Sequence, residues 1–222
     1  MDLYYTIVSP PSRSVLLLAK QLGVELNLKN LNLASGEHLT EDFRKINPQH
    51  CVPTLVTEDG VAIWESNAIL VYLAERFDLE GAIYPKDLAK RAVVQQRLCF
   101  DLGTLYKNIR AYYGPVALGL GTPGEDVLKQ VDQALEILES FLAKTKFVAG
   151  DSLTLADFAV ITSVTVASTM KHDMGKFPNV TRWVDLCKAT ISGYEEISKK
   201  ALDAWKERMV FILMRNSILF SN

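Results

Sequence analysis

The sequence has little that would build a metal site or a disulfide scaffold. Its 222 residues include only three cysteines and three histidines. The cysteines lie far apart and form no CxxC pair, so disulfide cross-links and a cysteine-based zinc site are not expected. The histidines show no zinc-ligand spacing either, and we expect no metal. Unpaired thiols are typical of proteins from the reducing cytoplasm.

The sequence also lacks an excess of charge and a long apolar run. It has 24 Lys and Arg against 26 Asp and Glu, a formal net charge of −2. No global field would therefore draw it to nucleic acid or to anionic lipid. The N-terminus has Asp2 where a signal peptide has basic residues, and the apolar tract 209–214 is too short to span a bilayer. We expect a cytoplasmic protein with neither nucleic acid nor membrane as partner.

Hydrophobic patterns divide the chain near residue 80. Before that point, strand-like runs and helical segments follow the order βαβ, then a short helix, then ββα. The expected strands cover 3–8, 26–33, 54–57 and 61–64, and the expected helices cover 15–22, 40–46 and the segment that Ser66 caps. After residue 87 the expected elements are helices over 88–118, 125–143, 155–171 and 178–190. We therefore predict an α/β domain over 1–80 and an all-α domain over 87–222.

Three local patterns in the second part of the chain each allow more than one interpretation. The segment 160–167 is rich in Val, Ile and Thr, and periodicity alone would allow a strand. The capping-box pattern of Thr154 and Asp157 favours a helix there. The glycine-rich segment 119–124 follows a helix rather than a strand, so we interpret it as a loop and not as a nucleotide site. His172 stands without acidic or cysteine partners in the sequence pattern and is expected to be structural.

Ser9 ends the first strand-like run and is followed by Pro10-Pro11-Ser12. One interpretation is a helix N-cap, with Pro10 at the first helical position, where its missing N–H costs nothing. The other is functional, because oxidoreductases with this order of elements carry a CxxC motif at the same turn. Serine cannot form a disulfide, but a hydroxyl at a helix N-terminus can stabilise an anion. The residues leave both interpretations open.

Two later segments suit a peptide-like ligand. Pro53 keeps Val52 extended, with backbone groups free to pair with such a ligand, and a cis bond before Pro53 is possible. Glu65 suits an ammonium group, while Ser66 and the N–H groups of a helix start suit a carboxylate. Together Glu65 and Ser66 match an amino-acid head group, although Ser66 alone is better explained as a plain helix cap.

A stripe of side chains on the first long helix has two interpretations. Its members are Tyr106, Ile109, Tyr113 and either Val116 or Ala117. A stripe at this spacing more often belongs to the core than to a substrate pocket. The two tyrosines favour a pocket, because each hydroxyl needs a partner.

Taken in order, several segments make the chain resemble cytosolic glutathione S-transferases of the insect delta and epsilon classes, from Tyr4 to about Trp205. These segments are Ser9-Pro10-Pro11-Ser12-Arg13, Gly36-Glu37-His38-Leu39, Ile46-Asn47-Pro48-Gln49-His50 with Val52-Pro53, Glu65-Ser66, Ile83-Tyr84-Pro85-Lys86, and Gly150-Asp151 through Thr154 to Asp157-Phe158. No single segment is specific, but their combination in this order is.

The resemblance implies a thioredoxin-like N-terminal domain that binds glutathione and an all-helical C-terminal domain that binds the hydrophobic co-substrate. Ser9 would be the catalytic residue, donating a hydrogen bond to the glutathione sulfur and holding it as a thiolate. Val52 would pair its backbone with the cysteinyl unit ahead of a cis Pro53. Glu65 and Ser66 would hold the γ-glutamyl group.

The same resemblance fills in the rest of the site. The remaining glutathione-binding residues would be Leu33, His38, His50, Cys51, Asn67 and Asp101, with His38 and His50 at the cysteinyl-glycine end and Asp101 as a supporting acid. The co-substrate site would comprise Pro11, Tyr106, Ile109, Tyr113 and Ala117. Asn67 is a departure, because delta enzymes usually have Arg and epsilon enzymes His at this position.

The implied activity is conjugation of the glutathione thiolate to hydrophobic electrophiles in detoxification, with glutathione as co-substrate and no metal. Two alternatives use the same fold: a non-catalytic carrier of hydrophobic ligands, and a glutathione-dependent peroxidase or isomerase. The resemblance also implies a homodimer, formed where the α/β domain of one chain meets the first long helices of the other. The apolar tail 209–220 lies outside the resemblance, and we expect it to fold against the helical domain.

Overall fold

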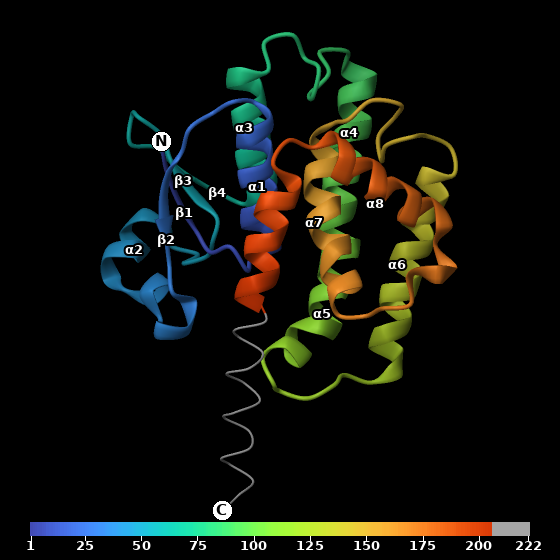
Figure 1. Cartoon of the computed structure of the whole chain (residues 1–222). Coiled ribbons are helices and arrows are strands. Elements are labelled where there is room, and N and C mark those ends of the chain that lie inside the picture. The colour runs from blue at the N-terminus through green and yellow to red at the C-terminus, as the bar shows by residue number, and fades with distance from the viewer. Residues whose placement is uncertain (206–222) are drawn as a thin grey trace, which may run out of the picture.

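The structure, a computed structural model, describes residues 1–205 (Figure 1). In chain order the elements are β1 (Asp2–Tyr5), α1 (Pro10–Gln21), β2 (Asn27–Asn30), η1 (Leu33–Ser35), η2 (Glu37–Leu39), α2 (Glu41–Ile46), β3 (Thr54–Val56), β4 (Ala62–Trp64), α3 (Ser66–Phe77), α4 (Leu88–Phe100), η3 (Asp101–Leu105), α5 (Tyr106–Ala117), α6 (Glu125–Leu142), α7 (Leu155–Thr169), η4 (Met174–Lys176) and α8 (Pro178–Thr190). Residues 194–205 are helical as well.

The strands form one sheet of order β2-β1-β3-β4, in which β1 and β2 are parallel and the other pairs are antiparallel. Leu3 and Leu55, paired across β1 and β3, are fully buried. Helices α1 and α3 cover the face of the sheet toward the helical half, and α2 covers the other face (Figure 1). Tyr4 on β1 packs edge-on against Phe43 of α2, with ring centroids 5.4 Å apart. The first part is therefore a three-layer α/β unit.

Helix α7 is the centre of the helical half and its junction with the sheet domain. It is apolar on almost every side, which is typical of a helix buried all round. It packs against α1 and α3 of the first part and against α4, α5 and α8 of the second. The fold thus places the N-terminus of α1, which begins at Pro10, directly beside the helical half.

The structure confirms the predicted order of elements, an α/β part followed by a helical part, and the helical interpretation of 160–167, and it corrects two details. Residues 160–167 are helical, and the capping box of Thr154 and Asp157 is formed. The expected helix over 88–118 is interrupted by the π-helical turn η3 between α4 and α5. Ser66 is not the cap of α3 but its first residue, because Glu65 occupies the N-cap position.

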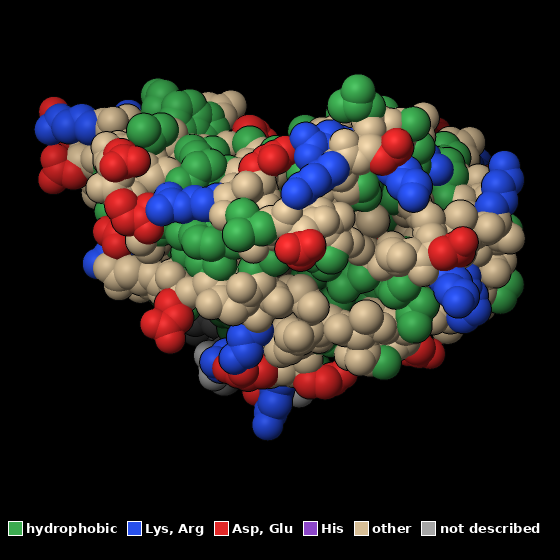
Figure 2. Space-filling model, turned by 90° about the horizontal axis from the view of Figure 1, so that it is seen from above, with side chains coloured by type: hydrophobic (Ala, Val, Ile, Leu, Met, Phe, Trp, Pro, Cys, Tyr) green, Lys and Arg blue, Asp and Glu red, His purple; other side chains and the backbone are tan. Residues whose placement is uncertain are grey.

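The surface carries no large region of one charge on the face shown in Figure 2, where Lys and Arg alternate with Asp and Glu. Among residues 1–205, no helix is long and apolar enough to cross a membrane. The tail 209–220, for which we expected packing against the helical domain, lies outside the described residues.

Candidate active site

A cavity of about 630 Å³ lies where the sheet domain meets the helices. Its walls come from the turn between β1 and α1, the loop before β3, the start of α3, η3, α5 and α7. Every residue predicted to bind glutathione lines it: Leu33, His38, His50, Cys51, Val52, Pro53, Glu65, Ser66, Asn67 and Asp101. Ser9, Pro11 and Tyr106 line it too. Segments far apart in the chain therefore converge on one cavity.

Ser9 is the N-cap of α1, and the proline-rich turn places its hydroxyl at the cavity. The backbone N–H of Ser12 donates to Ser9 Oγ at 3.3 Å. A serine hydroxyl has one hydrogen to donate and two lone pairs, so this bond occupies a lone pair and leaves the hydrogen available. No acceptor among the described residues takes that hydrogen. The two interpretations of Ser9 are thus compatible, because the cap leaves its donor free to face a ligand.

Arg13 fixes the segment that carries Ser9. Its side chain is buried, and its guanidinium donates to the carbonyl oxygens of Ile7 and Val8 at 3.5 and 3.3 Å and to that of Thr162 on α7 at 3.4 Å. Burial lowers the pKa of Arg13 to about 10, so it stays charged at neutral pH. One cation therefore ties the end of the first strand to α7 and holds the position of Ser9 relative to the helical half.

The loop before β3 is fixed by a buried amide. Asn47 is fully buried, and its Nδ2 donates to Thr54 Oγ1 at 2.8 Å and to the Cys51 carbonyl at 3.2 Å. Its Oδ1 accepts from the backbone N–H of Gln49 at 2.9 Å. The hydroxyl of Thr54 donates to the same Cys51 carbonyl. Asn47 thus holds the loop from both sides and fixes the residue that follows Cys51.

Val52 follows in this loop and presents its backbone to the cavity. The Val52–Pro53 peptide bond is cis, as the resemblance implied. Neither backbone polar group of Val52 makes a hydrogen bond to another described residue, although such groups are rarely left unpaired. Both are available to an extended peptide ligand.

Two residues of the cavity wall hold backbone conformations that are unfavourable for side-chain-bearing residues. The φ angles of His50 and Glu65 are +44° and +65°. Such conformations cost on the order of 1 kcal/mol or more and are found mainly at functional sites. At Glu65, this conformation brings the chain out of β4 and directly into α3. The N-terminal N–H groups of α3 and the Ser66 side chain then face the cavity edge.

Asn67 and Asp101 form the wall between α3 and η3. Asn67 Nδ2 donates to the carbonyl of Leu98 on α4 at 3.1 Å. Asp101 is 6% exposed and its Oδ1 has no hydrogen-bond partner among the described residues. Burial raises the pKa of Asp101 to about 7, and a hydrogen bond from Ser163 lowers it by less. Burial also raises the pKa of the neighbouring Tyr106.

The stripe on α5 divides between cavity and core. Tyr106 reaches the cavity, whereas Ile109, Tyr113 and Ala117 are buried and do not line it. The Tyr113 hydroxyl instead lies 2.8 Å from Nδ1 of His172. For these three residues the structure supports the interpretation as core, because the face of α5 turns from the cavity toward α6 and α7 along its length.

The structure corrects the expectation that His172 lacks an acidic partner. Its Nε2 lies 2.9 Å from Asp132 Oδ1 on α6, and Lys176 approaches the other oxygen of Asp132 at 3.4 Å. With Tyr113 on its opposite nitrogen, His172 joins α5 to α6. The expected structural role holds, but the partner lies 40 residues away in sequence, where no local pattern indicates it.

Several residues of the cavity wall were not predicted. Ala159, Thr162 and Ser163 contribute from α7, and Arg110 lies one turn after Tyr106 on α5. For the first three the available signal was their spacing of i, i+3 and i+4, which places them on one face of a helix. For Arg110 the signal was its i+4 relation to Tyr106.

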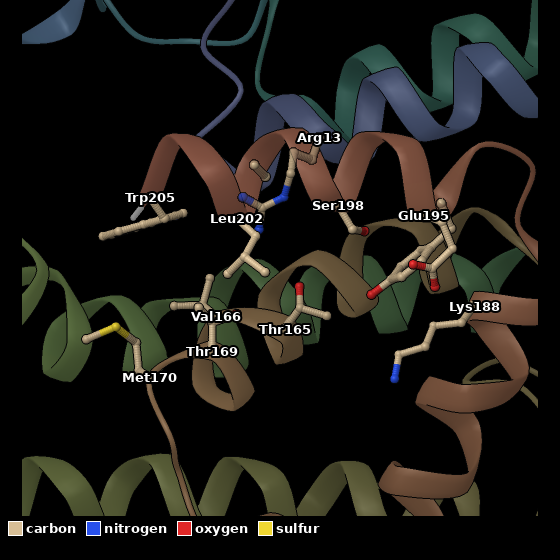
Figure 3. A pocket seen from close by; sticks show the side chains of 12 residues that line it. Arg13, Thr165, Val166, Thr169, Met170, Lys188, Glu195, Ser198, Leu202 and Trp205 are labelled. Atoms are coloured by element: carbon tan, nitrogen blue, oxygen red, sulfur yellow. The ribbon is translucent and has the colours of Figure 1, made fainter. Parts of the chain in front are cut away.

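A second cavity of about 290 Å³ lies between α7 and the helical residues 194–205, and Figure 3 shows its lining. Leu202, Val166 and Met170 form an apolar end beside Trp205, and Arg13 lies at its upper edge (Figure 3). Trp205 lines both cavities. The apolar side of the larger cavity therefore continues toward this helix.

Comparison with known proteins identifies the architecture. The profile of the glutathione S-transferase N-terminal domain matches residues 8–76, and that of the C-terminal domain matches residues 122–190. A solved delta-class glutathione transferase from Nilaparvata lugens is 43% identical, with a TM-score of 0.89 over 95% of this chain and 99% of that one. The chain belongs to the glutathione S-transferase family. Its relatives span both insect classes named by the resemblance.

Two further structures support this assignment. Glutathione S-transferase 1-6 from Anopheles dirus species B is 41% identical, with a TM-score of 0.86 over 91% of this chain and 96% of that one. An epsilon-class glutathione S-transferase from Musca domestica is 38% identical, with a TM-score of 0.84 over 93% of this chain and 97% of that one. The fold and the glutathione transferase activity expected from the sequence are confirmed. Neither the carrier nor the peroxidase or isomerase alternative is favoured.

Proposed function

We propose that Ser9 activates glutathione by donating its free hydroxyl hydrogen to the thiol sulfur and so stabilising the thiolate. The observation that carries this proposal is the Ser12 N–H bond to Ser9 Oγ, which leaves the hydroxyl hydrogen of Ser9 free at the cavity. A thiol of pKa ~8.5 is only a few per cent ionised at neutral pH. Lowering that pKa to ~6.5 requires about 2.7 kcal/mol, within the roughly 1.5–3 kcal/mol of one hydrogen bond to a charged group. The N-terminus of α1 adds to it, and no general base is needed.

Glutathione would lie along the cavity wall formed by the sheet domain. Val52 pairs its two open backbone groups with the cysteinyl unit, which places the sulfur toward Ser9. His38 and His50, whose ring centroids are 6.3 Å apart, contact the cysteinyl-glycine end together with Leu33 and Cys51. Ser66 and the start of α3 hold the γ-glutamyl carboxylate. Glu65 and Asp101 supply negative charge for its ammonium group, beside Asn67.

The hydrophobic co-substrate would enter on the helical side of the same cavity. Pro11 and Tyr106 line this side, and Trp205 extends it toward the second cavity. We assign residues 1–80 to glutathione binding and 87–222 to the electrophile, and we propose a role in detoxification of apolar electrophiles in the cytoplasm.

We further propose a homodimer formed by the α/β domain of one chain and the first long helices of the other. Leu88 and Val93 on α4 are 80% and 36% exposed, and Leu79 after α3 is 71% exposed. Such a dimer would remove these apolar side chains from water. Light scattering should give about twice the chain mass of 24.8 kDa. A single-chain mass at micromolar concentration would contradict the dimer.

Ser9→Ala tests the role of Ser9. Turnover with an aryl halide should fall strongly, and the apparent pKa of the bound thiol should rise by about two units, the shift calculated above. Glutathione should still bind, because Val52, Glu65 and Ser66 are unchanged. Ser12→Ala is the matched control, since the Ser12 side chain lies outside the cavity while its backbone N–H remains. If turnover and the thiol pKa were unchanged in Ser9→Ala, Ser9 would act only as a helix cap.

A further inference from the structure

Asp101 is a buried acid without a cation. It lies in η3, lines the glutathione cavity and is 6% exposed. Its Oδ1 has no hydrogen-bond partner, and Asp101 forms no ion pair with any described residue. Buried carboxylates are ordinarily paired, because an isolated charge in a low-dielectric site is costly. Asp101 therefore points to a group of a ligand as its partner.

Asn67, on the same cavity wall, does not supply a cation to Asp101. Its side chain is neutral, and its Nδ2 donates to the Leu98 carbonyl rather than to Asp101. A cationic side chain at this position would stand beside the same wall of the cavity. With Asn67 at this position, Asp101 has no cation beside it among the described residues, and only a hydrogen bond from Ser163 favours its ionised form.

The charged and titratable groups around η3 do not replace that cation. Those on neighbouring elements are Arg97 on α4, Tyr106 and Arg110 on α5, Asp132 on α6 and Asp157 on α7, with Arg13, His38, His50 and Glu65 on the sheet-domain side. Arg97 donates to the Val148 carbonyl, and Arg13 is held by backbone carbonyls. Asp132 pairs with His172 and Lys176. None of the cations is within ion-pair distance of Asp101.

We propose that Asp101 carries a proton in the empty site and exchanges it for the ammonium group of glutathione. On binding, the carboxyl O–H bond breaks, the proton leaves to water, and the carboxylate pairs with the ligand's –NH3⁺. No oxidant, reductant or covalent intermediate is involved. The inference rests on the proposed placement of the γ-glutamyl end, and it makes Asp101 the residue that selects a ligand with a free amino group.

The size of the effect follows from the burial of Asp101. With the pKa of Asp101 at about 7, roughly nine tenths of the empty sites hold this proton at pH 6 and about a quarter at pH 7.5. Because the ligand binds the ionised form, affinity should rise about eightfold from pH 6 to pH 7.5.

The experiment uses S-methylglutathione, which has no thiol proton to lose. Calorimetric titration of the full chain in two buffers of different ionisation enthalpy gives the number of protons released per ligand bound. We expect about 0.9 at pH 6 and about 0.25 at pH 7.5. An S-methylated analogue in which a glutaryl group replaces γ-glutamyl lacks the amine. It should bind without this release and without the eightfold rise.

Two variants test whether the proton released on binding comes from Asp101. Asp101→Asn should release none at either pH and lose the pH dependence of affinity. Asn67→Arg should release far less than wild type at pH 6, because the new cation keeps Asp101 ionised before the ligand arrives. Thermal melting identifies any variant that fails to fold. If Asp101→Asn fails to fold, Asn67→Arg still tests the proposal, because it leaves Asp101 in place.

The outcomes separate the two proposals. Binding of S-methylglutathione without proton release would overturn the inference on Asp101 and leave the proposed site standing. The same release from Asp101→Asn as from wild type would also overturn it, by assigning the proton to another group. No binding of S-methylglutathione to the wild type at any pH would instead contradict the proposed glutathione site itself.

Discussion

Replacing Asn47 with Ala should separate anchoring of glutathione from activation of its thiol. Asn47 is fully buried, and its side chain donates to Thr54 Oγ1 and to the carbonyl oxygen and Sγ of Cys51, and accepts from the Gln49 N–H. The Cys51 carbonyl keeps the Thr54 hydroxyl as donor, so the substitution leaves the Gln49 N–H as the main unpaired group. At about 1 kcal/mol per lost bond, with an added cost for that unpaired donor, the free energy of unfolding should fall by about 2–4 kcal/mol.

The same substitution loosens the segment that holds Val52, but not the turn that holds Ser9. KM for glutathione should therefore rise several-fold, while kcat at saturating glutathione changes little, because interactions made only in the transition state are intact. Urea unfolding and initial rates over a range of glutathione concentrations measure both effects. Asn30→Ala, on the exposed surface of β2, is the matched control and should change the unfolding free energy by no more than about 0.5 kcal/mol.

Two results would refute this reasoning about Asn47. A loss of less than about 0.5 kcal/mol would mean that the buried hydrogen bonds are replaced by relaxation of the loop. A fall in kcat equal to the fall in kcat/KM would mean that the loop before β3 acts on the transition state and not on the binding of glutathione.

Two further substitutions probe buried carboxyls. Asp157→Asn should lower the unfolding free energy by about 2–4 kcal/mol in chemical denaturation. Asp157 accepts hydrogen bonds from the backbone N–H groups of Val148 and Thr154 and from Trp183, and the NH2 group of the new amide must face one of these donors. An unchanged unfolding free energy would contradict this prediction. Without ligand, the raised pKa of Asp101 stabilises the folded form below pH 4, and this contribution, up to about 4 kcal/mol, is lost as pH rises through 7. The stability of wild type relative to Asp101→Asn should therefore decrease from pH 4 to pH 7, and a constant difference would contradict the buried, protonated acid.

The sequence predicted the elements that a local rule decides. Ser9 before two prolines is an N-cap signal, and the structure places it there. Thr154 and Asp157 form the expected capping box, and this settles the helix over 155–169 against its strand-like composition. At each of these positions, hydrogen bonds to neighbouring backbone fix the conformation, so a few residues carry enough information.

Features that depend on contacts between residues far apart in the sequence were not predicted, because no local pattern marks them. The π-helical turn η3 divides the predicted helix at Asp101, and nothing in the composition of 88–118 marks it. The pairing of His172 with Asp132 joins residues 40 apart. Residues of α7 are buried on nearly all sides, so hydrophobic periodicity could not indicate that the side bearing Ala159 and Ser163 lines the cavity.

The cavity places its three proposed tasks on three separately supported segments. Ser9 is held by its own helix cap and by Arg13, which reaches α7. Val52 is held by the hydrogen bonds of Asn47, within the sheet domain. The wall for the γ-glutamyl end depends on Asn67 and its bond to α4. Because these supports share no hydrogen bond, a change in one segment alters thiol activation, peptide anchoring or ammonium selection without requiring the others to change. The neutral Asn67 is therefore tolerable in an otherwise intact site: it affects how the amino group is bound and leaves the thiolate to Ser9.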